Sequence, residues 1–90
     1  SKSYSEAELS NLISEGMSLD KLVEHFGPPA SKHQIDRETV MMVYSFPLTP
    51  MQKGLHVAGF SVYIKNRSVV KWSPIMEETR QSSLPGGTQG

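Results

Sequence analysis

Three histidines are the side chains of this chain best suited to bind a metal or to move a proton near neutral pH. His25, His33 and His56 lie far apart in the sequence, and their spacing suits no single metal site. The chain has no cysteine, which excludes disulfide bonds, thiolate metal sites and thiol nucleophiles. We therefore expect each histidine to have a surface or capping role, and we predict that the protein binds no metal and no cofactor.

Sequence motifs for catalysis are missing as well. No serine lies in a Gly-x-Ser-x-Gly elbow, and no glycine-rich loop precedes a helix in the arrangement that holds a phosphate. The adjacent acids Glu77 and Glu78 lie in a polar stretch, where they resemble solubilising charges rather than a pair of catalytic carboxylates. Because the sequence shows no constellation of residues for acid–base catalysis, we predict that the protein is not an enzyme.

Charge is unevenly distributed along a chain whose formal net charge is zero. Residues 1–38 hold four basic and seven acidic residues, whereas residues 39–75 hold four basic residues and no acidic one. Lys65, Arg67 and Lys71 would lie close together on one hairpin. Each basic side chain near an anionic membrane contributes about 1 kcal/mol, so this group predicts only weak contact with anionic lipid head groups. The alternative is that these are solvated charges that protect strand edges from aggregation.

Ninety residues suffice for one domain with a thin core, and the pattern near the N-terminus predicts two short amphipathic helices. The first begins after Ser5, which forms a capping box with Glu8, and is expected to stop at Gly16. The second begins after Ser18 and ends at Gly27, where two prolines follow.

After the second helix the period of the apolar residues changes from 3.6 to 2, which indicates β-strands. The predicted strands cover residues 31–36, 39–46, 55–64 and 69–73, with Pro74 ending the last. By parity the even-numbered residues of the last three strands, Val70 among them, form one apolar face. The sequence thus predicts an α+β fold in which two N-terminal helices pack on one face of an antiparallel sheet of three or four strands, a two-layer sandwich. Residues 1–75 form this domain, and residues 76–90 form a polar tail or linker.

The opposite face of the predicted sheet is half apolar, and only the C-terminal tail is left to cover it. By parity this face carries Met41, Val43, Val57, Tyr63, Val69 and Lys71. An uncovered surface of this kind is typical of a protein-binding site, unless the tail folds back over it. The residues predicted to bind a partner are Met41, Val43, Tyr63 and Lys71 on the face, Met51 and Lys53 in the loop from Pro47 to Gly54, and the basic residues Lys65 and Arg67.

One segment resembles a known protein family. It is Gly16-Met17-Ser18-Leu19-Asp20-Lys21-Leu22-Val23-Glu24-His25-Phe26-Gly27-Pro28-Pro29. This segment resembles the second-helix signature of the SmpA/OmlA (BamE) lipoprotein family and of the related domains similar to β-lactamase inhibitor protein. The aromatic strand at Tyr44–Phe46 and the hairpin that follows Phe60 resemble the family in pattern, so that the resemblance covers roughly residues 5–73. The turn Lys65-Asn66-Arg67-Ser68 departs from it, since it lacks the usual Asp-Gly or Ser-Gly.

The resemblance implies a helix–helix–sheet domain in the envelope of a Gram-negative-type bacterium, in the periplasm or lipid-anchored at the outer membrane upstream of Ser1. It also implies a non-enzymatic protein-binding module whose partner is another envelope protein. There are two alternative functions. One is an inhibitor of a secreted enzyme, and the other is a nucleic-acid-binding domain with a basic aromatic sheet. The order of the elements is wrong for the common RNA-recognition fold, so we expect that the protein binds no nucleic acid. The oligomeric state stays open.

Overall fold

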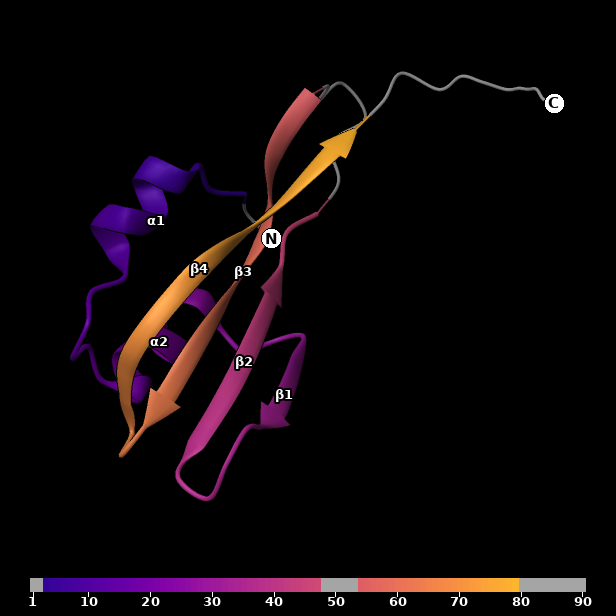
Figure 1. Ribbon diagram of the computed structural model, residues 1–90. Coiled ribbons are helices and arrows are strands. Elements are labelled where there is room, and N and C mark those ends of the chain that lie inside the picture. The colour runs from indigo at the N-terminus through magenta and orange to yellow at the C-terminus, as the bar shows by residue number, and fades with distance from the viewer. Residues whose placement is uncertain (1–2, 48–53, 80–90) are drawn as a thin grey trace, which may run out of the picture.

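The computed structural model describes residues 3–47 and 54–79. In these ranges the chain forms helices α1 (Glu6–Leu12) and α2 (Leu19–Phe26), then strands β1 (Ser31–Gln34), β2 (Thr39–Ser45), β3 (Gly54–Lys65) and β4 (Ser68–Thr79). The strands form one antiparallel sheet of four strands in the order β1-β2-β3-β4, and Figure 1 shows both helices on one side of it. The predicted α+β class is confirmed. No helix in the described ranges is long and apolar enough to cross a membrane.

The polar residues expected to begin the helices do so. The hydroxyl of Ser5 accepts the N–H of Glu8 at 3.1 Å, while the Glu8 carboxylate accepts the N–H of Ser5 at 2.8 Å. The hydroxyl of Ser18 accepts the N–H of Lys21 at 3.1 Å. Gly27 ends α2 with a φ of 80°, in the left-handed region that favours glycine. These local bonds satisfy backbone groups that a helix end leaves without partners.

The end of the first helix differs from the expectation. Helix α1 ends at Leu12 rather than at Gly16, because the residues that follow pair with the edge of β4 instead of continuing the helix. The N–H of Gly16 donates to the carbonyl of Val69 at 2.7 Å, and the N–H of Val69 donates to the carbonyl of Met17 at 2.8 Å. The connection between the helices is thereby fixed to the sheet.

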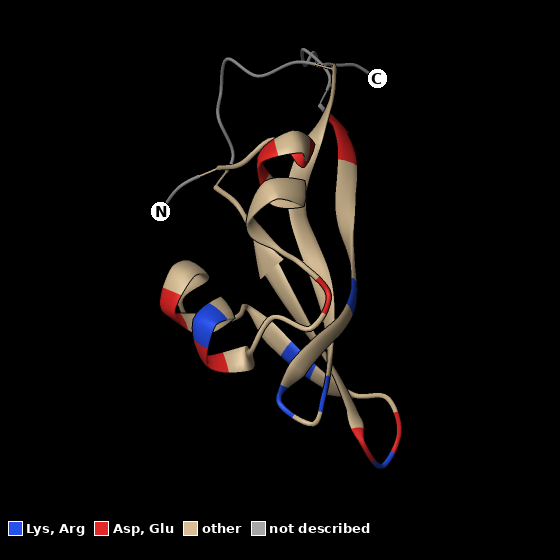
Figure 2. Cartoon of the chain, turned by 90° about the vertical axis from the view of Figure 1, so that its left-hand side faces the viewer, with Lys and Arg blue, Asp and Glu red and all other residues tan. Residues whose placement is uncertain are grey.

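One buried cluster joins the helices to the sheet. Leu9 of α1, Leu22 of α2 and Phe60 of β3 are fully buried in the same cluster. The hydroxyl of Tyr44 in β2 donates to the carbonyl of Gly27 at 2.7 Å, which ties the end of α2 to the sheet. Figure 2 looks from the side of the helices and shows them in front of the strands.

A β-bulge in β4 overturns part of the predicted parity. Val70 is the extra residue between the pairs Ile64↔Val69 and Tyr63↔Lys71. One inserted residue moves its neighbours to opposite faces. The prediction that Val70 lies on the inner face and Val69 on the outer one is therefore wrong: Val69 is 1% exposed in the core and Val70 is 44% exposed.

A second bulge lies in β3. Ala58 is the extra residue between the pairs Val57↔Met76 and Gly59↔Ile75. Val57 was predicted on the face opposite the helices, but it packs against the core cluster. From Gly59 to Ile64 the predicted alternation holds, because this stretch lies between the two bulges.

Strand β4 does not end at Pro74 as predicted, but continues to Thr79. It lies at one edge of the described sheet, where a proline is tolerated because its missing N–H breaks no bond to the neighbouring strand. The strand therefore crosses the boundary predicted between residues 75 and 76. The rest of the predicted tail, and with it the alternative that the tail covers the sheet, lies outside the described residues, as do Met51 and Lys53.

Candidate functional site

Three rows across the strands make up the middle of the sheet face opposite the helices, and we call these three rows the helix-free face. Antiparallel partners point to the same side of a sheet, so the strand pairing defines each row. The first row holds His33, Met41, Tyr63 and Lys71. The second holds Ser31, Val43, Ser61 and Ser73, and the third holds Ser45, Gly59 and Ile75. The residues predicted for this face, Met41, Val43, Tyr63 and Lys71, lie on adjacent positions of it.

The first row combines an apolar, an aromatic and a cationic side chain. Met41 and Tyr63 are half-buried partners on β2 and β3. The ammonium of Lys71 lies 4.6 Å from the centre of the Tyr63 ring, a cation–π contact. The contact holds the Lys71 cation beside the apolar part of the row.

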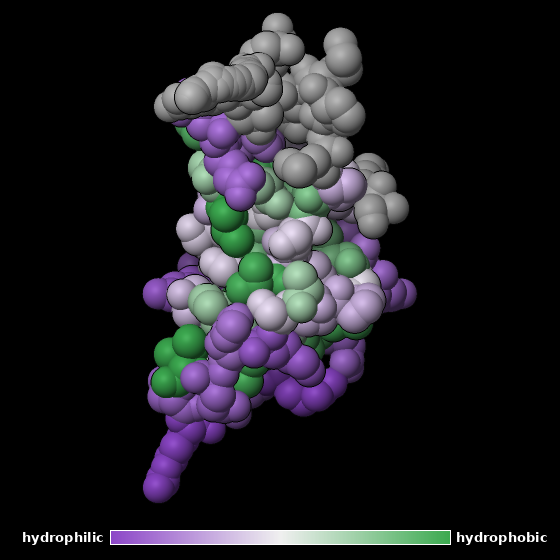
Figure 3. Space-filling model, turned by 90° about the vertical axis from the view of Figure 1, so that its right-hand side faces the viewer, coloured by the Kyte–Doolittle hydropathy of each residue, from purple (hydrophilic) through white to green (hydrophobic). Residues whose placement is uncertain are grey.

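The second and third rows are built mostly from small side chains, which leave the sheet backbone close to any partner. Lys71 carries the one formal charge in the three rows. Figure 3 looks from the side away from the helices and shows apolar and weakly polar residues across the middle, with hydrophilic residues gathered at the lower end. The helix-free face is therefore a patch of low charge with a polar border.

Two of the predicted basic residues are paired with carboxylates from distant segments. The Lys65 ammonium lies 3.3 Å from the Glu38 carboxylate, and the Arg67 guanidinium lies 2.6 Å from that of Asp20. Figure 2 shows that basic residues gather at this lower end of the sheet, beside acidic ones. In residues 3–47 and 54–79, Lys71 alone of the three predicted basic residues has no carboxylate partner. The excess positive charge available to an anionic lipid surface is smaller than the sequence indicates.

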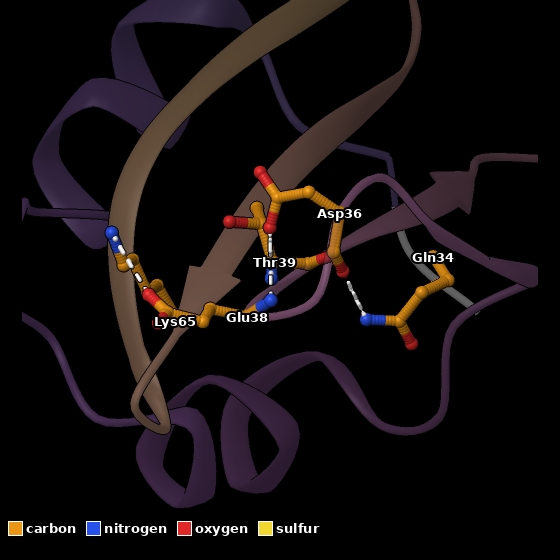
Figure 4. Close-up of polar contacts among 5 residues, drawn as sticks. All are labelled: Gln34, Asp36, Glu38, Thr39 and Lys65. Carbon is orange, nitrogen blue, oxygen red and sulfur yellow. Dashed lines mark hydrogen bonds and ion pairs between the residues drawn. The ribbon is translucent and has the colours of Figure 1, made fainter.

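The turn between β1 and β2 holds Glu38 in place for this pairing (Figure 4). One oxygen of the Asp36 carboxylate accepts the N–H groups of Glu38 and Thr39, each at 2.9 Å. These hydrogen bonds favour the charged form of the Asp36 carboxyl and so lower its pKa below the ordinary value of 3.8. The bond from the Glu38 N–H has the largest effect. The Gln34 amide donates to the carbonyl of Asp36 at 2.6 Å. The turn at Asp36 therefore lies between the two strands predicted over residues 31–36 and 39–46, and β1 ends at Gln34.

The three histidines lie on different elements. The exposed His25 ring, in the last turn of α2, lies 4.9 Å from the Phe26 ring, and the His33 ring on β1 lies 3.1 Å from the Ser31 hydroxyl. His56 is buried in β3, with Nδ1 3.1 Å from the carbonyl of Gly54. The described part of the chain contains no group of three side chains that could hold a metal. The absence of metal and cofactor binding stays a prediction.

The sequence reasoning missed Ile75, which extends the helix-free face along β4. The strand was predicted to end at Pro74, so no residue beyond it was placed on the sheet. Ile75 pairs with Gly59 and lies on the same side as Val43 and Tyr63. The apolar residues that follow Pro74, Ile75 and Met76, were the available signal for a longer strand.

Comparisons of the chain with models of known protein families, with characterised proteins and with solved structures found no match. The resemblance to the SmpA/OmlA lipoprotein family therefore stays a prediction. The residues that carry it have structural roles in this chain: Gly16 and Met17 bond to the edge of β4, Ser18 begins α2 and Gly27 ends it. Such residues bear on the fold more directly than on the partner.

Proposed function

We propose that this chain is a non-enzymatic protein-binding module and that the helix-free face is its contact surface. The observation that supports the proposal is the first row of that face, where Met41 and Tyr63 lie half-buried with Lys71 beside them, in three rows that hold no other formally charged side chain. Aromatic residues and methionine are enriched in the centres of protein interfaces, whereas charged residues are depleted there.

The partner is proposed to be a protein surface with aliphatic groups opposite Met41 and Val43 and a carboxylate opposite Lys71. The cation–π contact leaves the Lys71 ammonium exposed at the edge of the row, where a partner's acid reaches it. A nucleic acid is a poorer match, because binding to phosphates requires several cations and the three rows offer one.

The proposed setting is the cell envelope of a bacterium, where the partner is another envelope protein. This part of the proposal rests on the resemblance of residues 16–29 to the envelope lipoprotein signature. Fractionation of the native cells tests it. Recovery of the protein with the envelope fraction agrees with the proposal, and recovery with the cytosolic fraction overturns it.

Site-specific photo-crosslinking tests the contact surface. A benzophenone amino acid is placed at Tyr63 on the helix-free face and, as a control, at Val23 on the outer side of α2, which is 37% exposed. In native cells we expect position 63, and not position 23, to form a covalent adduct with one protein identified by mass spectrometry. Equal adducts from both positions, or an adduct with nucleic acid at position 63, contradict the proposal.

A charge substitution provides the second test. Val43→Glu buries a carboxylate in the middle of the interface without changing the core, so we expect it to abolish the adduct formed at position 63. Val23→Glu makes the same chemical change away from the face and should leave the adduct unchanged. Thermal unfolding of both variants establishes that they are folded. An adduct that persists in folded Val43→Glu shows that the helix-free face is not the site.

A further inference from the structure

A depression of about 250 Å³ opens on the helix side of the sheet, at the end where β3 turns into β4. We call it the hairpin pocket. Its apolar floor is formed by Leu19, Val40, Met42 and Ile64, and its rim includes Lys32 and Arg67. The pocket exists because α2 begins at Leu19, whose N–H donates to the carbonyl of Arg67 at 2.8 Å, and does not extend over the adjoining ends of β1 and β2.

The rim of the hairpin pocket has an excess of positive charge. Lys32 is the partner of the buried Met42 across β1 and β2, so it points to the helix side, over the pocket. Within the described residues, Lys32 has no ion pair and no side-chain hydrogen bond. The acid on the rim, Glu38, is paired with Lys65, and Arg67 is paired with one oxygen of Asp20. The Lys32 cation is thus uncompensated beside an apolar floor.

The backbone at Arg67 is a second feature of this rim. Arg67 has a φ of 59°, a left-handed conformation that glycine adopts at a lower cost. The two-residue turn between β3 and β4 requires this conformation, so the turn fixes where residue 67 stands on the rim. The side chain at this position supplies guanidinium donors, of which the pair with Asp20 uses one nitrogen.

We infer that the hairpin pocket binds a small aliphatic carboxylate, with its chain on the apolar floor and its carboxylate beside Lys32 and Arg67. A depression of about 250 Å³ admits only a small ligand of several non-hydrogen atoms, such as hexanoate or the C-terminal leucine of a peptide. So few atoms in an open depression predict a dissociation constant on the order of 1 mM. The inference does not depend on the proposed function, because the pocket and the helix-free face lie on opposite sides of the sheet.

Titration of the ¹⁵N-labelled protein with hexanoate, followed by amide chemical shifts, tests the inference. We expect saturable shifts at Leu19, Val40, Ile64 and Arg67, and not at the helix-free face. Hexanol, which has the same chain without the charge, should bind more weakly. Lys32→Gln should weaken hexanoate binding by about fivefold, the effect of one partly screened charge. Lys71→Gln removes a cation from the opposite face and should leave it unchanged.

Further probes distinguish the two sources of such a carboxylate. Tighter binding of N-acetylleucine than of hexanoate identifies a peptide C-terminus, and tighter binding of hexanoate identifies a free short-chain acid. N-acetylleucine amide lacks the carboxylate and should not bind. The inference is overturned by any of three results: no saturable shifts at the floor residues, equal binding of hexanol and hexanoate, or an equal loss in Lys32→Gln and Lys71→Gln. The spectrum of each variant shows directly whether it is folded.

Discussion

Replacement of Arg67 by glycine is predicted to stabilise the protein although it removes an ion pair. The turn between β3 and β4 has Asn66 at a φ of 52° and Arg67 at 59°, as a type I′ turn requires at both central positions. Asparagine tolerates this conformation, but for other residues with a Cβ atom it costs about 1–2 kcal/mol. Glycine removes this cost. It also gives the unfolded chain more conformational freedom, which folding must then remove, so the net gain in stability is about 1 kcal/mol.

The loss that opposes this gain is smaller. The Arg67–Asp20 pair is short, at 2.6 Å, but its side chains are 69% and 81% exposed. Exposed pairs contribute about 0.5 kcal/mol, because water and salt screen the charges. The carbonyl of residue 67, which accepts the N–H of Leu19, is retained in the glycine variant. The expected net effect of Arg67→Gly is stabilisation by about 0.5 kcal/mol, or an increase in Tm of about 2–4 °C for a domain of this size.

Urea unfolding at two salt concentrations separates the two contributions. The control is Arg67→Ala, which removes the ion pair but keeps a Cβ atom in the left-handed conformation; we expect it to be less stable than the wild type by about 0.5 kcal/mol. In about 1 M salt the Debye length falls to roughly 3 Å and the pair is screened. The advantage of Arg67→Gly should then rise to about 1 kcal/mol, and Arg67→Ala should match the wild type.

The reasoning is refuted if Arg67→Gly is no more stable than Arg67→Ala in high salt. Both variants lose the same side-chain contacts, so that result would mean that the left-handed backbone conformation at residue 67 carries no cost that glycine removes. A gain in stability that does not grow with salt would instead refute the value assigned to the ion pair.

Three further predictions concern the core and the turns. Gly59→Ala should lower the free energy of unfolding by about 3 kcal/mol, because a Cβ atom there collides with the backbone carbonyl of Tyr44; Ser61→Ala on the same strand, measured by the same urea unfolding, should change it little. Tyr44→Phe loses the bond to Gly27 and should cost about 1 kcal/mol at neutral pH. Because burial raises the pKa of Tyr44 above its ordinary value of 10.0, the wild type should also lose stability as the pH rises past that value, and Tyr44→Phe should remove this part of the alkaline loss in thermal unfolding. The pKa of Asp36 lies below 3.8, so its contribution to stability is present above that pH and disappears as the pH falls through the folded value; acid titration of Asp36→Asn should show a smaller loss than the wild type, and an equal loss would contradict the assignment.

The parts of the fold that short-range chemistry sets were predictable. A hydroxyl before an amphipathic stretch begins each helix, as Ser5 and Ser18 do, because the bond runs to a backbone group three residues away. The turn at residues 65–68 and the polar edge strand that starts at Ser31 follow from equally local patterns. The low-charge face with Met41 and Tyr63 was predictable for the same reason, since alternation in β2 and the middle of β3 is unbroken.

The bulges were not predictable, because they depend on the partner strand. Nothing in the order Ser68-Val69-Val70-Lys71 distinguishes a regular strand from one in which Val70 is inserted. The bulge is favoured because the backbone of Val69 bonds to Gly16 and Met17 while its side chain packs in the core. The continuation of β4 past Pro74 has a similar cause, since a proline is compatible with a strand only if its nitrogen faces away from the neighbour.

The sequence by itself determined the class of the fold, the starts of its helices and the apolar alternation of its central strands, because each of these follows from interactions between residues a few positions apart. Only the tertiary structure decided which cations are free. Lys65 and Arg67 are paired with Glu38 and Asp20, which are distant in the sequence and are brought close by the packing of α2 and the β1–β2 turn against the hairpin. Charge attraction acts through space, so it is the fold, and not the order in the chain, that leaves Lys71 on one face and Lys32 on the other without a carboxylate partner among the described residues.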